Sequence, residues 1–136
     1  MRLIKFLVLP LLLFVSIGFA QERAKNIYKA IVDPDGIQRV TVLGSEYFYD
    51  PDYIVVKVDV PVEITIKKEP GLIPHNMVIK EIEAGIDIRE TISTEPKVIK
   101  FTPKKAGKYS FYCDKKLLFL KSHRKRGMEG ILEVTE

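Results

Sequence analysis

Residues 108–134 read KYSFYCDKKLLFLKSHRKRGMEGILEV, two strand-like ends separated by a long basic middle. In the first end Tyr109, Phe111 and Cys113 occupy alternate positions, so in a strand their side chains lie on one face. Residues 130–134 form a second short run after the basic middle. The stretch therefore predicts the last two strands of a β domain, with a long loop between them and Cys113 where the first strand ends.

Upstream of this stretch, short alternating or β-branched runs are separated by turn residues such as the Asp-Pro-Asp-Gly of residues 33–36. About eight strands with a turn every 8–12 positions indicate an all-β, Greek-key β-sandwich. A short helix is considered only for residues 114–122. The predicted strands are residues 37–43, 53–58, 62–67, 76–80, 86–92, 97–101, 108–112 and 130–134.

The first residues have the pattern of an export signal. Arg2 and Lys5 give a basic start, and residues 7–19 are almost wholly apolar. Gly18-Phe19-Ala20 then places small residues at the two positions that a signal peptidase inspects. We therefore predict that residues 1–20 are a signal peptide.

A retained membrane anchor is the alternative for this segment. The apolar run is shorter than the roughly 20 residues that a bilayer span needs, and Pro10 interrupts it. Cleavage near Ala20 leaves residues 21–136 as one domain, expected in the periplasm or otherwise outside the cytoplasm. All 18 acids and 20 of the 22 bases lie beyond residue 20, so this domain carries a net charge of +2. This charge predicts no nucleic-acid partner, and no glycine-rich phosphate loop or paired nucleophile and base is present.

Cysteine and histidine are both scarce. The chain has one cysteine, Cys113, and two histidines, His75 and His123. Exported proteins usually carry their cysteines in pairs as disulfides. A single exported thiol therefore indicates a buried side chain, a bond to another chain or a bound metal.

Together, His75, Cys113, His123 and Met128 supply two imidazoles, one thiolate and one thioether. This is the donor set of a blue copper centre, with two His and one Cys in a plane and a weak axial Met. Taken singly, each has an ordinary explanation: a strand-end histidine, a structural thiol or a core methionine. Zinc could occupy the same donors, and Met77 is a second candidate for the axial place. Copper is the metal that the combined set favours.

Several motifs carry a family resemblance. The chain resembles the cupredoxins, the family that contains plastocyanin and azurin, over roughly residues 38–136. The resemblance implies a rigid β-sandwich with a mononuclear type 1 copper site. The motifs are residues 53–58 (YIVVKV), 73–76 (IPHN), 101–103 (FTP) and 106–113 (AGKYSFYC).

By this resemblance His75, Cys113 and His123 are equatorial ligands and Met128 is axial. Asn76 would tie the two ligand-bearing segments together through hydrogen bonds. His123 would be the more exposed imidazole and the exit route for an electron. A related dinuclear copper centre needs two cysteines in one loop, so the single cysteine excludes it.

The interval between Cys113 and the second histidine departs from the plastocyanin and azurin pattern. Residues 114–122 intervene, whereas those proteins place the histidine only a few residues after the cysteine. This length resembles the loop of the copper nitrite reductases. Asp114 also stands where plastocyanin-like sequences often carry Thr or Ser.

The same loop combines apolar residues 117–120 with six bases, which gives residues 113–126 a net charge of +5. We interpret it either as a solvated loop that caps the sandwich or as a docking face for an acidic redox partner, such as a cytochrome or oxidase, or for anionic lipid. The leading functional hypothesis is a monomeric electron carrier cycling between Cu(I) and Cu(II). The alternative is a copper chaperone or buffer that delivers copper to a cuproenzyme. An enzyme is not expected, because catalysis of the nitrite reductase type needs further histidines.

Overall fold

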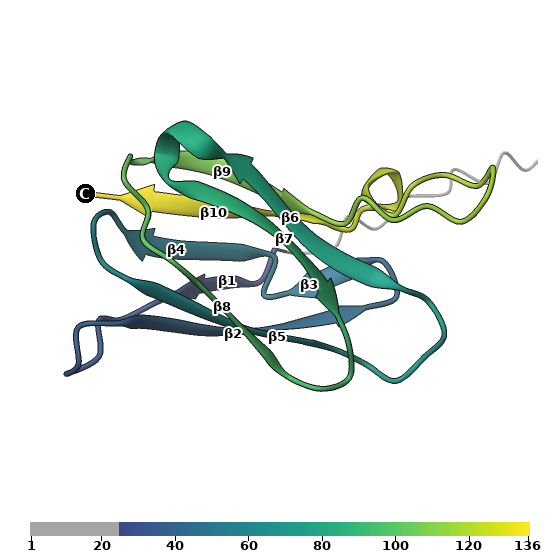
Figure 1. The fold of residues 1–136 in the computed structure, drawn as a ribbon, viewed down its shortest axis with the longest axis horizontal. Helices are drawn as coiled ribbons and strands as arrows, with labels where there is room; N and C mark the ends of the chain where they lie inside the picture. Colours follow the sequence, from purple (N-terminus) through teal and green to yellow (C-terminus); the bar gives the residue numbers. More distant parts are fainter. Residues whose placement is uncertain (1–24) are drawn as a thin grey trace, which may run out of the picture.

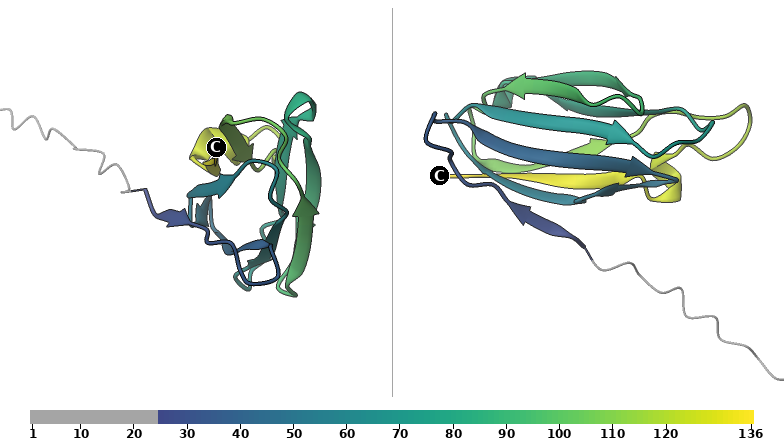
Figure 2. Two further views of the ribbon diagram at one scale, coloured as in Figure 1. Left: turned by 90° about the vertical axis from the view of Figure 1, so that its left-hand side faces the viewer. Right: turned by 90° about the horizontal axis from the view of Figure 1, so that it is seen from below.

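The computed structural model describes residues 25–136, so the predicted export signal lies outside the described part of the chain. Within residues 25–136, ten strands form two sheets packed face to face (Figures 1 and 2). No helix in this range is long and apolar enough to cross a membrane. The strands are β1 (Ile27–Lys29), β2 (Gln38–Ser45), β3 (Phe48–Asp50), β4 (Tyr53–Lys57), β5 (Val62–Lys68), β6 (His75–Glu81), β7 (Ile86–Ile92), β8 (Lys97–Phe101), β9 (Gly107–Tyr112) and β10 (Glu129–Thr135).

The strand order shows how the chain connects the two sheets. The larger sheet has the order β1-β4-β10-β9-β6-β7, and the smaller has the order β3-β2-β5-β8. From β3 to β6 the chain changes sheet at every step, which ties the two layers together. The pairs β1–β4, β4–β10 and β2–β5 are parallel, and the other strand pairs of these sheets are antiparallel. The predicted all-β sandwich is confirmed.

Alternation along the strands builds the core between the sheets. In β5 the side chains of Val62, Ile64 and Ile66 are buried, whereas the intervening residues lie on the outer face. Burying one large aliphatic side chain contributes about 1.5–3 kcal/mol. Buried side chains from both sheets form one hydrophobic core cluster within residues 25–136.

One close approach stiffens the β9–β10 pair. Phe111 of β9 lies across Gly130 of β10, where an added Cβ would be 2.2 Å from the Phe111 ring and 2.6 Å from the Asp52 carbonyl oxygen. The Phe111 ring also packs edge-on against Tyr49, with ring centroids 5.2 Å apart. Only glycine leaves room for this packing. The glycine at residue 130 therefore determines how β10, the strand after the long loop, packs against β9.

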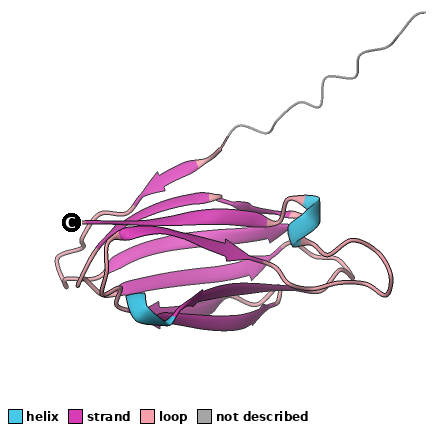
Figure 3. Ribbon diagram, turned by 90° about the horizontal axis from the view of Figure 1, so that it is seen from above, coloured by secondary structure: helices cyan, strands magenta, loops and turns pink. Residues whose placement is uncertain are grey.

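The strands β1 and β3 were missed by the sequence prediction because three-residue strands are too short to show alternation. The helix considered for residues 114–122 is absent; the described helical turns are η1 (Ile82–Ala84) and η2 (Arg124–Arg126) (Figure 3). Leu118 has φ 48°, which interrupts a right-handed helix. Residues 117–120 are also exposed, so no packing surface stabilises a helix there.

Candidate metal centre

Neighbouring strands bring the predicted donors to one end of the sandwich. His75 is the first residue of β6, and Cys113 directly follows β9. These strands are antiparallel neighbours that pair at Val78 and Tyr112, so the start of β6 lies beside the end of β9. The β9–β10 loop, residues 113–128, then projects beyond the sheets at this end (Figure 1).

Backbone hydrogen bonds close the base of the β9–β10 loop. The Cys113 N–H donates to the Met128 carbonyl at 3.0 Å, and the Arg124 N–H donates to the Cys113 carbonyl at 3.1 Å. The Met128 N–H donates to the His123 carbonyl at 3.0 Å, and the His123 N–H donates to the Lys115 carbonyl at 2.9 Å. The backbone positions of Cys113, His123 and Met128 are therefore fixed relative to one another.

Three of the predicted donors form a compact triangle. The Nδ1 atoms of His75 and His123 are 3.2 Å apart, and the Cys113 Sγ lies 3.9 Å and 3.5 Å from them. A point equidistant from the three atoms is about 2 Å from each, close to the usual metal–ligand bond lengths for imidazole and thiolate. The side chains of His75, Cys113 and His123 are only 3%, 0% and 4% exposed.

Met128 is buried beside this triangle, and its backbone bonds hold it next to Cys113 and His123. An added Cβ on Gly44, in β2 of the opposite sheet, would lie 3.6 Å from the Met128 methyl carbon. Met77 is also buried, but it stands two residues along β6 from His75 and not in the closing loop. Together His75, Cys113, His123 and Met128 fit a type 1 copper site.

Burial keeps both imidazoles neutral and able to donate a lone pair. It lowers the pKa of His75 to about 4, and the nearby charges of His123 and Lys68 act in the same direction. The pKa of His123 is also lowered, first by burial and then by the charge of Arg126. A neutral imidazole is the form that binds a metal ion.

Opposing influences act on the pKa of the Cys113 thiol. Burial raises the pKa of Cys113, and the backbone N–H groups of Asn76 and Lys115 act against that rise by hydrogen bonding to the sulfur. These two amides are donors that favour the thiolate. Since a metal ion binds the thiolate, the amides support the charged form that the ion requires.

Asn76 connects the two donor-bearing segments, as the sequence predicted. Its side-chain amide donates to the Asp114 carboxylate at 2.7 Å, and its side-chain oxygen accepts from the Asp114 N–H at 3.1 Å. Tyr49 Oη donates to the Asn76 carbonyl oxygen at 2.6 Å. Arg89 of β7 forms an ion pair with the Asp114 carboxylate. The unusual residue after Cys113 therefore belongs to the framework that holds the centre.

Tyr47 was not identified from the sequence. Its ring meets the His123 ring edge-on, with centroids 5.1 Å apart, and the Arg126 guanidinium lies 4.6 Å from the Tyr47 ring centroid. Tyr47 lies in the turn between β2 and β3, far from both donor segments in sequence. No local pattern marks such a contact, because the fold alone brings this turn to His123.

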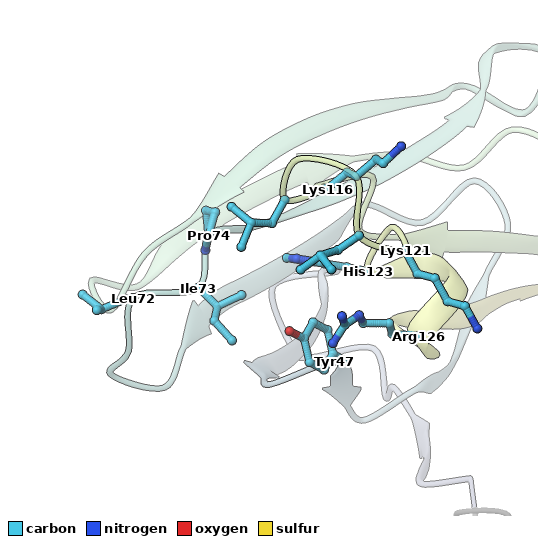
Figure 4. Close-up of a pocket in the computed structure, with 10 residues that line it drawn as sticks. Tyr47, Leu72, Ile73, Pro74, Lys116, Lys121, His123 and Arg126 are labelled. Carbon is cyan, nitrogen blue, oxygen red and sulfur yellow. The ribbon is translucent and has the colours of Figure 1, made fainter.

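The expected difference in exposure between the two imidazoles is very small, with His123 4% exposed and His75 3% exposed. His123 lies at a hollow of about 250 Å³ at the metal end of the sandwich (Figure 4). The hollow is mainly apolar, with basic side chains among the residues that surround it. Its lining residues are Tyr47, Leu72, Ile73, Pro74, Lys116, Leu117, Leu120, Lys121, His123 and Arg126.

The sandwich and the donor set define a small all-β protein with a mononuclear copper centre. Residues 9–125 match the family model of the cupredoxin-like domain, and the chain belongs to this family, whose members bind copper. No curated protein is similar enough in sequence to match. The family match ends before Met128, so it does not include this residue.

Solved structures with the same fold include three copper proteins. The metal-binding domain of the Cu(I)-exporting P-type ATPase CopA of Streptococcus pneumoniae D39, solved with Cu(I), is 27% identical, with a TM-score of 0.62 and coverage of 84% of this chain and 100% of that domain. A copper-binding protein solved in its apo form is 25% identical, with a TM-score of 0.59 and coverage of 79% and 96%. Auracyanin from Roseiflexus castenholzii is 20% identical, with a TM-score of 0.56 and coverage of 72% and 97%, and shows the fold alone.

Proposed function

We propose that this protein is an exported electron carrier in which His75, Cys113 and His123 are the equatorial ligands of copper and Met128 is the axial ligand. The observation that carries the proposal is the closed donor triangle, with edges of 3.2 to 3.9 Å and side chains almost fully removed from solvent. A closed site favours retention of the metal ion. Because the donors are buried, electron transfer through the surrounding protein is the activity that such a site supports best.

Bound copper would supply a one-electron couple between Cu(I) and Cu(II). The sulfur atoms of Cys113 and Met128 favour Cu(I), whereas the two imidazoles serve both oxidation states. The hydrogen-bonded loop base and the Asn76–Asp114 contact hold these donors in place. A fixed donor set keeps rearrangement small when the charge of the site changes.

We further propose that electrons pass through His123 and the hollow at its side, to a redox partner with an acidic docking face. The bases around the hollow would attract such a face and would also disfavour Cu(II) electrostatically. A carrier is favoured over an enzyme because both histidines of the chain are already used in this centre. Residues 1–20 would act as the signal peptide, and residues 21–136 would be the exported, monomeric domain.

Copper delivery is the second candidate function. It is supported by the 27% identity with the CopA metal-binding domain, a domain that this chain covers completely. The two sulfur donors also suit Cu(I). A delivery protein must release its ion quickly to an acceptor. If delivery is the function, this site should therefore transfer copper to a chelator rapidly, although its donors are buried.

The first experiment adds Cu(II) to metal-free protein comprising residues 21–136 and records the visible spectrum beside that of Cys113→Ser. We expect an intense thiolate-to-copper charge-transfer band that the variant lacks. Weak colour that survives in Cys113→Ser would refute the type 1 assignment. Voltammetry and transfer to a Cu(I) chelator then separate the two functions: reversible cycling with slow transfer supports the carrier, and rapid transfer supports delivery.

A matched pair of variants tests the axial ligand. Met128→Leu should raise the reduction potential, because losing a weak donor destabilises Cu(II) more than Cu(I). Met77→Leu removes the same thioether from a neighbouring core position and should leave the potential nearly unchanged. The reverse result would assign the axial place to Met77.

A further inference from the structure

The outermost part of the β9–β10 loop exposes a continuous apolar segment. Residues 117–120 are Leu-Leu-Phe-Leu, and the side chains of Leu118 and Phe119 are 76% and 90% exposed. The loop projects beyond the ends of the strands, and Leu72, which lines the same hollow as Leu117, adds a further exposed apolar side chain (Figures 2 and 4). Folding has left this surface unburied, although apolar groups gain free energy when they leave water.

The backbone presents these side chains outward. The Leu120 N–H donates to the Leu117 carbonyl at 3.0 Å, which closes a tight turn around Leu118 and Phe119. Leu118 has φ 48°, a left-handed conformation that suits glycine or asparagine and is unfavourable for leucine. The turn therefore holds a large apolar residue at its apex in a conformation that leucine ordinarily avoids.

Positive charge surrounds this apex. Residues 115–128 contain six bases and no acid. Arg124 pairs with Glu129, but Lys116, Lys121 and Lys125 form no ion pair with any residue in the described range 25–136. Two of these free cations, Lys116 and Lys121, directly flank the apolar segment in sequence.

We propose that the tip of the β9–β10 loop binds the surface of an anionic phospholipid bilayer, with Leu118 and Phe119 inserted at the boundary between headgroups and acyl chains. The flanking lysines then lie at the level of the phosphate groups. This arrangement, apolar and aromatic side chains inward with cations at the headgroups, is how peripheral segments bind anionic membranes. The inference does not depend on copper or on the proposed function.

The shape of the tip favours a lipid surface over a protein partner. Transient protein interfaces mix polar and apolar groups over a broad, complementary surface. Two adjacent side chains on a projecting turn would need a matching cavity in a protein, whereas a bilayer accepts them without one. The charge pattern also favours a lipid surface, because anionic headgroups complement cations on both sides of the apex.

The test places a fluorescent reporter at the tip. The chain has no tryptophan, so Phe119→Trp and Ile82→Trp, each in protein comprising residues 21–136, create single reporters. Ile82 is 72% exposed in η1, which follows β6 and so lies at the opposite end from His75. On vesicles of phosphatidylglycerol and phosphatidylcholine, the emission of Phe119→Trp should shift to shorter wavelength and be quenched by brominated lipid. The emission of Ile82→Trp should not change.

Sedimentation with the same vesicles measures the contribution of each group. Leu118→Ser/Phe119→Ser should weaken binding at least about tenfold, because two apolar side chains are lost from the bilayer. Lys116→Gln/Lys121→Gln should weaken it by about 25-fold, since each cation contributes roughly fivefold. The control variants Ile31→Ser/Ile82→Ser and Lys80→Gln/Lys105→Gln should bind like the parent protein. Their residues are exposed and lie near the ends of β1 and β6 or the start of β9, at the end of the sandwich opposite to the tip.

Vesicles of phosphatidylcholine alone should bind at least about tenfold more weakly, and added salt should release the protein from anionic vesicles. Absence of an emission shift for Phe119→Trp on anionic vesicles would overturn the proposal and leave an acidic protein face as the better occupant. Equal loss of binding in the far-end control variants would also overturn it, because the tip would then have no special role.

Discussion

The base and the tip of the β9–β10 loop differ sharply in how they are held. The base, residues 113–115 and 122–128, has seven backbone hydrogen bonds among its own residues and a side-chain bridge from Asn76 to Asp114. The tip, residues 116–121, has the single turn bond from Leu120 to Leu117 and exposes its apolar side chains. The base joins the core of the sandwich, whereas the tip projects from it.

This difference separates metal binding from surface recognition. The donor atoms are positioned by the base and by β6, so changes in the tip alter what the surface binds without moving a donor. Stability and copper spectra should therefore respond to changes in the base and its supports. Substitutions in the tip should leave the copper spectrum unchanged and should alter stability only slightly.

The strongest expected effect is at the strand that supports the base. Gly130→Ala places a Cβ 2.2 Å from the Phe111 ring and should destabilise the metal-free protein by about 3 kcal/mol or more. Gly44→Ala is the matched control, since its Cβ would meet the Met128 methyl carbon at an ordinary 3.6 Å. Urea unfolding of both variants measures the difference. Equal stability of the two would show that Phe111 can move aside freely.

Asn76→Ala should have the next largest effect. The variant loses two hydrogen bonds to Asp114 and leaves the Asp114 backbone N–H without its partner, a loss of about 2 kcal/mol. Asn26→Ala, at an exposed asparagine that bonds to Asp50, should cost less than about 0.5 kcal/mol. Copper dissociation should also be faster in Asn76→Ala only. Unchanged unfolding and dissociation would mean that the bridge adds nothing to the base.

Acid should weaken the metal-free protein through its buried imidazoles. The folded state holds the pKa of His75 near 4, whereas the unfolded chain has the ordinary value of 6.5, so the unfolded chain takes up the proton first. Stability is complete above about pH 6.5 and is lost as the pH falls toward 4, by roughly 1–2 kcal/mol between pH 7 and pH 5. Urea unfolding across this range checks the slope, and His75→Gln should flatten it. An equally steep slope in that variant would assign the effect to other groups.

The smallest effect is expected at the apex of the tip. Leu118→Asn suits the left-handed backbone at φ 48° and should stabilise the protein by about 0.5 kcal/mol. The copper band should keep its position and intensity, because no donor is touched. Thermal unfolding and the visible spectrum measure both properties. A shifted band would show that the tip and the donors are coupled after all.

Much of the fold could be predicted from the sequence because alternation is a local property. Residues 62–67 show it clearly, and β5 is observed at Val62–Lys68. Strand β1 has no buried side chain, so its residues carry no alternating apolar signal. A short helix was considered for residues 114–122, but a helix of this length needs a surface to pack on, and residues 117–120 are exposed.

The donor set could be named from residue types, but the surroundings of the centre could not. His75 and Cys113 stood out because the chain has so few histidines and cysteines. The contacts of Arg89 with Asp114 and of Tyr47 with His123 join residues that are 25 and 76 positions apart in sequence. Such contacts depend on which strands become neighbours, and a single sequence does not specify that order.

The bond from the His123 N–H to the Lys115 carbonyl has a practical consequence for protein engineering. It makes residues 116–121 an exchangeable cassette whose two ends are held by the fold and not by the cassette itself. Recognition peptides, epitope tags or shorter turns can be grafted there while the copper centre is retained.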